Sequence, residues 1–478
     1  MKRISVFLIA VALVAGMVGC GGGVQYSLHI STTIGGNVTT PGVGDFTYDE
    51  GAIVNLVGQA EEGYYFIRWT GDVDTVGNVN AATTTITAND DYTITANFVP
   101  DGVESLWDWY DLDAIRDNVD GNYILMNDLD FTTAGYEELA SPTANGGQGW
   151  QPIGHRDAEF DGMFDGKGYE IRDLFIDGGD DVGLFGWVDE GGHIRNVGVV
   201  NADVTGGRFA GILVGDNFGR VSNAYSTGSI TGTDVVGGLL GFNNGPISAS
   251  HFIGSVTGDG VVGGLVGGNW LCSVTDSYAT GNVAGDGIVG GLIGDNDGGT
   301  VSNCCFTGSV TGEEIVGGLM GDNNGHVSNA YSAGSVTGID GLGGLTGRNF
   351  GTISNSYSTG AVYGERYVGG LVGDNSDTVN NSYSIGSVTG TEMVGGLVGR
   401  SRLGGAASNS FWDVETSGQA TSAGGTGKNT TEMQDFTTFS GVGWNITTVA
   451  SPSTRNTSYI WNMVDDKTYP FLSWEAVS

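Results

Sequence analysis

The apolar positions of residues 25–99 alternate with polar ones, as expected for half-buried strands. Tyr26, Leu28 and Ile30 point to one side of the first such segment, and polar residues stand between them. Further alternating segments run over residues 53–57, 64–69, 83–87 and 92–98. Residues 25–100 are therefore predicted to form a small antiparallel β module.

From about residue 183 the pattern changes to a long-period repeat. A block of the type Gly-Gly-Leu-x-Gly recurs, and after a first interval of 29 residues it returns every 26 or 27 residues. Three apolar columns keep the same register as this block. They are Leu184, Leu213, Leu239, Leu265, Leu292, Leu319, Leu345, Leu371 and Leu397; Val221, Ile247, Val274, Val301, Val327, Ile353 and Val379; and Ile230, Val256, Val283, Val310, Val336, Val362 and Val388.

Three short strands per repeat, each with one inward column, describe the three sides of a coil. Stacked coils bury such columns as ladders, and each repeat contacts only its neighbours. The chain is therefore predicted to be all-β, with a parallel β-helix or solenoid of 26–27-residue coils over residues 183–410 that follows the small antiparallel module. Because the open ends of a solenoid expose unpaired strand edges, both ends are expected to be capped.

The composition fits such a coil. The 478 residues include 88 Gly, and Gly at fixed corners is expected to supply the positive φ that a sharp turn needs. Asn recurs two places after the block, and a column of Asn amides is expected to bond from coil to coil. These residues are Asn217, Asn243, Asn269, Asn296, Asn323, Asn349 and Asn375.

The net charge narrows the choice of partners. Lys and Arg number 17 against 54 Asp and Glu, which gives a net charge of −37. Because the phosphates of nucleic acid need a basic surface, nucleic acid is excluded as a partner.

The N-terminus has the features of an export signal. Lys2 and Arg3 precede an apolar stretch that is too short to span a bilayer comfortably. Residues 17–20, Met-Val-Gly-Cys, resemble a bacterial lipobox. The resemblance implies that residues 1–19 are a lipoprotein signal peptide, that Cys20 carries the lipid and contacts the membrane through it, and that residues 20–24 are a flexible tether. The protein would then be anchored in the cell envelope, outside the cytoplasmic membrane; an ordinary cleaved signal is the alternative.

Two family resemblances cover most of the chain. Residues 62–72 and 92–98 resemble the divergent internalin-type B-repeat, which implies a spacer or adhesive bead. Residues 368–375 followed by 381–386 resemble the GLUG motif, and the likeness extends over residues 104–475 because the flanks also match such proteins. On this basis residues 104–182 are expected to form the N-terminal cap and first coils, and residues 411–478 the C-terminal cap.

The sequence gives little support for an enzyme. Some immunoglobulin-A-specific metallopeptidases carry GLUG repeats, but their zinc domain needs His-Glu-x-x-His, which the five His residues never form. A glycan-cleaving β-helix is the more serious reading, because a hydrolase needs two carboxylates that flank one bond. Asp295 and Asp322 hold the same position on adjacent coils and would lie ~5 Å apart. Alternatively, Asp at this position simply favours a solvated turn.

From Asp322 onward that position alternates in sign, as Asp322, Arg348, Asp374 and Arg400. This alternation predicts ion pairs between neighbouring coils rather than a catalytic cluster.

A second corner of the repeat is acidic. Asp259, Asp286, Glu313 and Glu314 belong to it, and stacked carboxylates can attract divalent cations. Weak Ca²⁺ binding there is a hypothesis; no firm metal site and no other cofactor are predicted. The Cys residues after Cys20 (Cys272, Cys304 and Cys305) have no zinc-ligand spacing and are interpreted as core residues.

The repeat also carries an aromatic column that includes Tyr331, Tyr357 and Tyr383. Rings in such a column either offer a strip on which sugars stack or stack on one another as packing. Together these features predict a lipid-anchored surface protein with a non-enzymatic, adhesin-like or structural role. Its expected partner is an extracellular protein or glycan. A glycan-binding or glycan-cleaving β-helix is the alternative.

Overall fold

The computed structural model describes residues 24–475, so Cys20 and its predicted lipid lie outside the described residues. The chain divides after Val103 into two compact units. No helix among residues 24–475 is both long and apolar enough to cross a bilayer.

The described part of the N-terminal unit, from residue 24 onward, contains seven strands in two sheets. They are β1 (Gln25–Thr32), β2 (Gly36–Thr40), β3 (Gly44–Asp49), β4 (Ala52–Ala60), β5 (Tyr64–Gly71), β6 (Thr83–Ala88) and β7 (Tyr92–Pro100). Leu28, Ile30, Trp69 and Ile94 are buried in the core between them. The strands pair antiparallel as predicted except for β1 and β7, which run parallel at the centre of the order β3-β1-β7-β5.

The first residues of the second unit close the start of the solenoid. The short helices α1 (Trp109–Asp113), η1 (Ala114–Asp117), α2 (Tyr136–Leu139) and η2 (Ala144–Gly147) lie in this segment. Trp109, Leu112 and Ile115 are buried in the same cluster as the solenoid core, and the ring of Trp109 lies 5.7 Å from that of Trp150. The predicted N-terminal capping segment is therefore built on aromatic packing.

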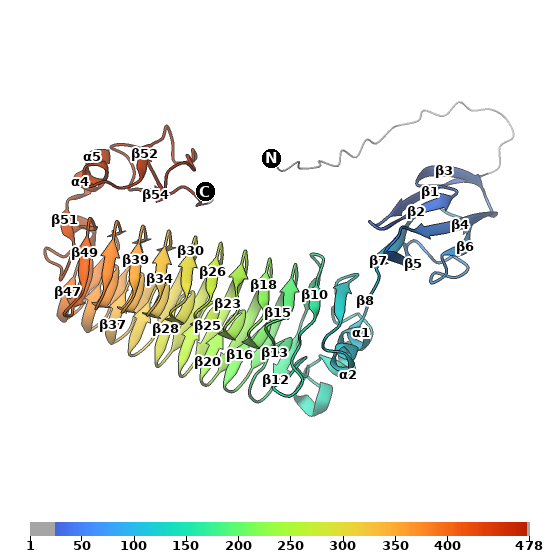
Figure 1. The fold of residues 1–478 in the computed structure, drawn as a ribbon, viewed down its shortest axis with the longest axis horizontal. Coiled ribbons are helices and arrows are strands. Elements are labelled where there is room, and N and C mark those ends of the chain that lie inside the picture. The colour runs from blue at the N-terminus through green and yellow to red at the C-terminus, as the bar shows by residue number, and fades with distance from the viewer. Residues whose placement is uncertain (1–23, 476–478) are drawn as a thin grey trace. The chain divides into compact units, whose positions relative to one another are not determined.

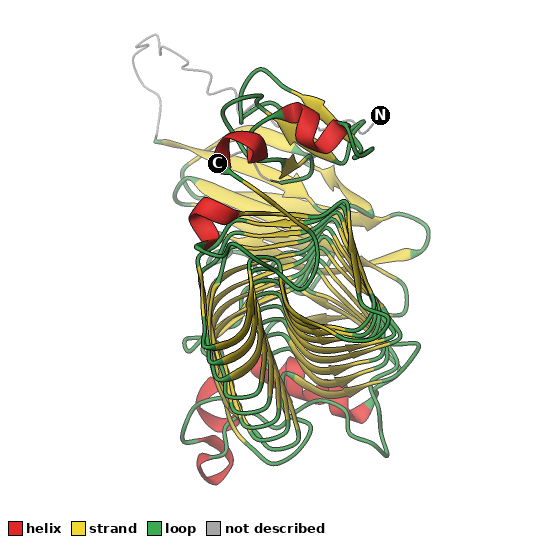
Figure 2. Ribbon diagram, turned by 90° about the vertical axis from the view of Figure 1, so that its left-hand side faces the viewer, coloured by secondary structure: helices red, strands yellow, loops and turns green. Residues whose placement is uncertain are grey.

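The described coils stack into four parallel sheets (Figures 1 and 2). The eight-stranded sheet contains β16 (Phe209–Gly211), β20 (Val235–Gly237), β24 (Val261–Gly263), β28 (Ile288–Gly290), β32 (Ile315–Gly317), β37 (Asp340–Gly343), β42 (Arg366–Gly369) and β47 (Glu392–Gly395). The nine-stranded sheet contains β13 (Phe185–Val188), β17 (Val214–Asn217), β21 (Leu240–Asn243), β25 (Val266–Trp270), β29 (Ile293–Asp297), β33 (Met320–Asn323), β38 (Thr346–Asn349), β43 (Val372–Asn375) and β48 (Val398–Ser401).

Two further sheets complete each coil. The twelve-stranded sheet contains β8 (Val103–Leu106), β9 (Asn122–Leu125), β10 (Met163–Asp165), β14 (His193–Arg195), β18 (Arg220–Ser222), β22 (Ile247–Ser248), β26 (Ser273–Thr275), β30 (Thr300–Ser302), β34 (His326–Ser328), β39 (Thr352–Ser354), β44 (Thr378–Asn380) and β49 (Ala406–Ser408). The fifteen-stranded sheet contains β11 (Glu170–Arg172), β12 (Phe175–Asp177), β15 (Gly198–Thr205), β19 (Tyr225–Gly232), β23 (His251–Gly258), β27 (Tyr278–Gly285), β31 (Cys305–Thr311), β35 (Tyr331–Ser332), β36 (Ser335–Thr337), β40 (Tyr357–Ser358), β41 (Val362–Tyr363), β45 (Tyr383–Ser384), β46 (Val388–Thr389), β50 (Phe411–Asp413) and β51 (Thr426–Lys428).

The parallel solenoid is thus confirmed, but the expectation of three sides is wrong. The Leu column belongs to no strand: Leu239 stands between β20 and β21, and its amide bonds to the carbonyl of Leu265 on the next coil. The Leu residues therefore form a buried ladder at a bend, and a short strand lies on each side of it.

The role expected for Gly holds only in part: Gly228, Gly281 and Gly308, at one ladder position of the fifteen-stranded sheet, have φ of 134°, 135° and 144°. The block Gly residues do not have positive φ; instead, a Cβ on Gly237 would lie 2.0 Å from the carbonyl oxygen of Leu240, so close backbone approach demands Gly there. The repeated positive-φ corner is filled mainly by Asn, as at Asn223 and Asn303 with φ of 51° and 53°. Asn tolerates this conformation better than most other side chains.

The predicted Asn ladder is confirmed. Each amide nitrogen from Asn217 to Asn349 donates to the Oδ1 of the next Asn at 2.7–2.9 Å. All seven Asn side chains of the ladder are buried. The ladder therefore lies inside the solenoid, where its hydrogen bonds have no competition from water.

The C-terminal residues do more than cap the last coil. Residues 411–428 close it, since Thr421 and Ala423 bond to Gly396 and Val398. Residues 429–475 then fold back along the flank of the last coils (Figure 1). They contain α4 (Thr430–Met433), α5 (Phe436–Ser440), β52 (Ile446–Thr448), β53 (Trp461–Met463) and β54 (Phe471–Leu472), after α3 (Val414–Ser417) in the closing segment. We call residues 429–475 the flank segment.

Candidate functional site

The clearest change of chemistry along the solenoid lies on the nine-stranded sheet. One position of each strand pairs in register with the same position on the next coil, and we call this set the outer column. It reads Trp187, Asp216, Phe242, Gly268, Asp295, Asp322, Arg348, Asp374 and Arg400. The column thus passes from an aromatic section, through a Gly, to an acidic pair and then to alternating charges.

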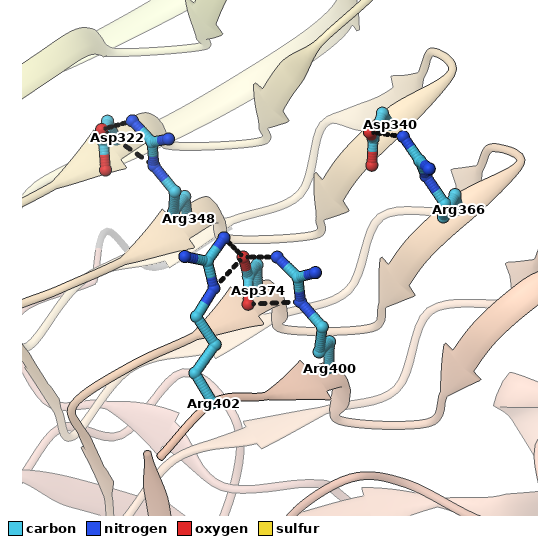
Figure 3. A network of polar contacts seen from close by, with 7 residues as sticks. All are labelled: Asp322, Asp340, Arg348, Arg366, Asp374, Arg400 and Arg402. Atoms are coloured by element: carbon cyan, nitrogen blue, oxygen red, sulfur yellow. Dashed lines mark hydrogen bonds and ion pairs between the residues drawn. The ribbon is translucent and has the colours of Figure 1, made fainter. Parts of the chain in front are cut away.

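The alternating section forms the predicted ion pairs (Figure 3). Arg348 pairs with Asp322, and its Nε donates to that carboxylate at 3.1 Å. Asp374 accepts from the Nε atoms of both Arg400 and Arg402, at 2.9 and 2.8 Å. Burial acts to raise the pKa of Asp374, but hydrogen bonds from the two guanidinium groups outweigh it and the pKa lies below its usual value. Asp374 is therefore held as a structural anion, and Asp322 is held in place by its ion pair with Arg348.

A pocket of about 340 Å³ opens in this section. Arg348, Asp374, Arg400 and Arg402 line it together with Tyr367, over whose ring the Arg400 guanidinium lies at 3.6 Å. The charges that line the pocket are largely paired with one another, and a stacked cation–π contact adds to their packing. This pocket is therefore a neutralised ion-pair network.

Asp295 and Asp322 lie in register on adjacent strands, as the spacing predicted. Burial and then the neighbouring Asp322 raise the pKa of Asp295 to about 6. The Oδ1 atom of Asp295 has no hydrogen-bond partner among the described residues. The pair therefore combines one carboxylate that is easily protonated with one that Arg348 holds.

The aromatic section surrounds a buried acid that the sequence did not single out. Asp216 is 2% exposed and stands in the ladder between Trp187 and Phe242. Burial and then Asp181 raise the pKa of Asp216, which Arg156 and Arg208 lower again, to about 7. Asp216 is therefore protonated in a substantial fraction of molecules at neutral pH.

This shift gives a pH-dependent stability. Since an unfolded Asp titrates near ~3.9, the folded chain holds a proton at Asp216 between about pH 4 and pH 7, and stability falls as the pH rises through that window. We expect Asp216→Asn to flatten this fall and to raise the free energy of unfolding at pH 8 by about 1–3 kcal/mol. Chemical denaturation at a series of pH values measures this. The exposed Asp177, changed to Asn as a control, should leave the slope unchanged, and equal slopes for Asp216→Asn and wild type would contradict the assignment.

The acidic corner gains no support as a metal site. Asp259, Asp286, Glu313 and Glu314 are all exposed at turns of their own coils. Within residues 24–475, no three His, Cys, Asp or Glu side chains converge so that they could hold a metal ion. Weak Ca²⁺ binding at this corner stays a prediction.

The Tyr column is covered by the chain itself, which corrects the idea of a sugar-stacking strip at Tyr331, Tyr357 and Tyr383. Tyr357 and Tyr383 are 6% and 1% exposed, and rings of the flank segment lie against them, with Trp461 at 6.0 and 5.8 Å. The rings also stack on one another, with Tyr357 and Tyr383 5.0 Å apart and within 1° of parallel. Their faces are therefore occupied, and they act as packing.

The structure instead gathers other rings on the outer column. Phe242 lies 5.4 Å from Phe209, 6.5 Å from Phe218 and 6.4 Å from Trp270. Trp187 stacks on Phe218 at 5.4 Å. The sequence does carry a sign of these rings, because aromatic residues replace Asp or Arg at some positions of the outer column and recur two places after it. The Tyr column is easier to recognise in the sequence because it repeats.

Comparison with known proteins confirms both resemblances. Residues 26–102 match the family model of the divergent InlB B-repeat domain, and residues 258–284 match that of the GLUG motif. Halomucin of Haloquadratum walsbyi is 34% identical over 158 residues, or 31% of this chain and 2% of halomucin. A protein of Evansella cellulosilytica named as a Gly-rich membrane protein is 36% identical over 119 residues, which cover 23% of this chain and 13% of that protein.

Two solved structures resemble this chain in fold, at lower sequence identity than the two relatives above. An IgA1 protease has a TM-score of 0.41 at 18% identity, over 66% of this chain and 25% of that chain. A protein from Bacteroides ovatus named as an immunoglobulin A1 protease has a TM-score of 0.29 at 17% identity, over 78% of this chain and 92% of that chain. Likenesses at these scores carry no argument about function.

Proposed function

We propose that this chain is a lipid-anchored cell-surface protein whose solenoid has a non-enzymatic, adhesin-like or structural role. The carrying observation is the outer column itself, in which Asp322 and Asp374 are fixed by Arg residues of the next coils. Such carboxylates serve as parts of a rigid surface rather than as a general acid and base. Similarity to a protein named as a membrane protein supports the envelope location. The partner would be an extracellular protein or glycan.

The anchor is tested at Cys20. In cells fed a clickable fatty acid, the wild-type chain should carry label and sediment with membranes, whereas Cys20→Ala should carry none and become soluble. Cys272→Ala is the matched control, because that thiol lies within the solenoid. Equal label in wild type and Cys20→Ala would contradict lipid attachment.

Glycan cleavage is the second candidate, and Asp295 is the observation that favours it. A glycosidase uses two neighbouring carboxylates, one of which acts as the general acid. Asp295, whose pKa is raised to about 6, stands in register with the carboxylate of Asp322. Reducing-end release by the purified full chain, abolished by Asp295→Asn, would replace the non-enzymatic proposal with this one. If the full chain releases no reducing ends from linear glycans, that result supports the non-enzymatic binding role.

A further inference from the structure

Another pocket, of about 330 Å³, lies where the flank segment packs against the solenoid. Asn303 and Asn329, which follow β30 and β34, form one side of it, and residues of the flank segment form the rest. This volume is within the ~300–1,000 Å³ of typical small-molecule sites. We propose that the pocket binds a sugar unit of a neutral glycan. The proposal assigns a ligand class to the surface role above and rests on that role.

The pocket is open to solvent. Asn445, Thr457, Ser458 and Tyr459 line it, and all four are exposed. The last three belong to the loop between β52 and β53 of the flank segment. A ligand therefore reaches the pocket from the surface of the molecule, and the pocket exists only while the flank segment is docked.

The lining of the pocket is polar but uncharged. Asn, Ser and Thr side chains supply most of its polar atoms, and no Asp, Glu, Lys, Arg or His among residues 24–475 belongs to the lining. Amides and hydroxyls offer both donors and acceptors, as sugar hydroxyls do. An anionic ligand would find no cation in the lining and would be repelled by a chain of net charge −37. The lining therefore favours a neutral ligand with many hydroxyl groups.

Several polar groups of the lining lack protein partners. Asn445 accepts from the Ile460 amide through Oδ1 at 2.8 Å, which fixes its carboxamide and leaves Nδ2 without a partner among the described residues. The Ser458 hydroxyl and the Asn329 side chain also make no hydrogen bond within residues 24–475. A ligand with several hydroxyls can supply partners for these groups.

Two aromatic rings border the pocket. The Trp474 ring is held in place, since its Nε1 donates to the Asn329 carbonyl at 3.0 Å and the ring packs 5.7 Å from that of Tyr331. Tyr459 is 40% exposed, and no other ring in the described part of the chain contacts its ring. A free ring face beside amide and hydroxyl groups matches the apolar face and the hydroxyl edge of a sugar.

Ligand-observed NMR on the full chain in mild detergent tests the site. The neutral probes are the methyl glycosides of glucose, galactose, mannose and N-acetylglucosamine. Sorbitol carries hydroxyl groups without a ring face, and methyl glucuronide carries a negative charge. We expect at least one neutral glycoside to bind, and sorbitol and methyl glucuronide not to bind.

Two variants locate the site. Tyr459→Ala should weaken binding of that glycoside about tenfold, because it removes a stacking surface. Asn329→Ala should also weaken it about tenfold, through lost hydrogen bonds. The backbone accepts Ala there, since Ala249 holds the same corner of an earlier coil with φ of 50°. Asn355→Ala, at the same corner one coil further and outside the lining, is the matched control and should bind as wild type does.

The outcomes separate this proposal from the one that it rests on. Absence of binding to every neutral glycoside, equal affinity of wild type, Tyr459→Ala and Asn329→Ala, or equally tight binding of sorbitol overturns the sugar site. Surface exposure is measured independently, by protease shaving of intact cells, so that an exposed chain without sugar affinity leaves the surface role standing. Both variants should keep wild-type thermal unfolding and a trypsin-resistant flank segment, which shows that the loss of binding comes from the pocket.

Discussion

Asn296→Leu should lower the free energy of unfolding of the solenoid by about 3–5 kcal/mol. The Asn296 side chain is fully buried, accepts from Asn269 at 2.8 Å and donates to Asn323 at 2.9 Å and to the Gly299 carbonyl at 3.1 Å. Leu is similar in size but can make none of these bonds. Three buried groups would each lose a partner, at about 1–3 kcal/mol apiece.

Hydrogen exchange measures which coils lose stability in Asn296→Leu. Because each coil contacts only its neighbours, peptides that cover residues 262–330 should lose protection first, while those near residue 390 should keep theirs. The control is Asn282→Leu, since Asn282 is exposed and its side chain accepts a hydrogen bond from the half-buried Ser309 hydroxyl; a change within about 0.5 kcal/mol is expected there. A loss below about 1 kcal/mol for Asn296→Leu would mean that the ladder contributes little.

The repeat made much of this fold predictable. Leu239, Val256 and Asn243 recur in fixed register, and stacking identical positions leaves few other ways to bury them. The ion pair between Arg348 and Asp322 follows from the same register, since opposite charges one coil apart must face each other. Local periodicity therefore predicted both the ladders and their chemistry.

The number of sheets and the role of Gly could not be predicted from the periodicity of the sequence, because both depend on the backbone geometry of the coil. Counting one apolar column per side gave three sides, but Val236 and Leu240 are also buried on either side of Leu239. The block Gly residues looked like turn formers. Their actual constraint combines two contacts: the tight local bend brings the Leu240 carbonyl against Gly237, and stacking brings the Gly267 amide of the next coil within 2.6 Å of where a Cβ would stand.

The aromatic section of the outer column was not predicted because its rings do not repeat. Phe242 and Trp270 break their columns, and a search for regular positions passes over such exceptions. In a repeat protein, stacking already explains the positions that follow the pattern, so functional residues are expected among the positions that depart from it.

Trp461→Ala should release the flank segment from the solenoid without unfolding the coils. The Trp461 ring is fully buried and lies 4.9 Å from Trp444, 5.8 Å from Tyr383 and 6.0 Å from Tyr357. Truncation of such a ring costs about 3–5 kcal/mol. That cost is a large share of the docking free energy available to a short segment with few strands of its own. The flank segment should therefore no longer dock onto the solenoid.

Limited trypsin digestion detects the release of the flank segment, because Arg455 and Lys467 lie in it. The variant should be cut at these sites early, while the fragment that ends near residue 428 resists, since the coils keep their own closing segment at residues 411–428. Tyr459→Ala, at a ring that is 40% exposed, is the control and should digest as wild type does. If the coils were degraded together with the segment, the flank would be an integral part of the solenoid. Early cutting confined to the flank would instead show that it is a separate layer, docked onto a Tyr ladder that the solenoid itself builds.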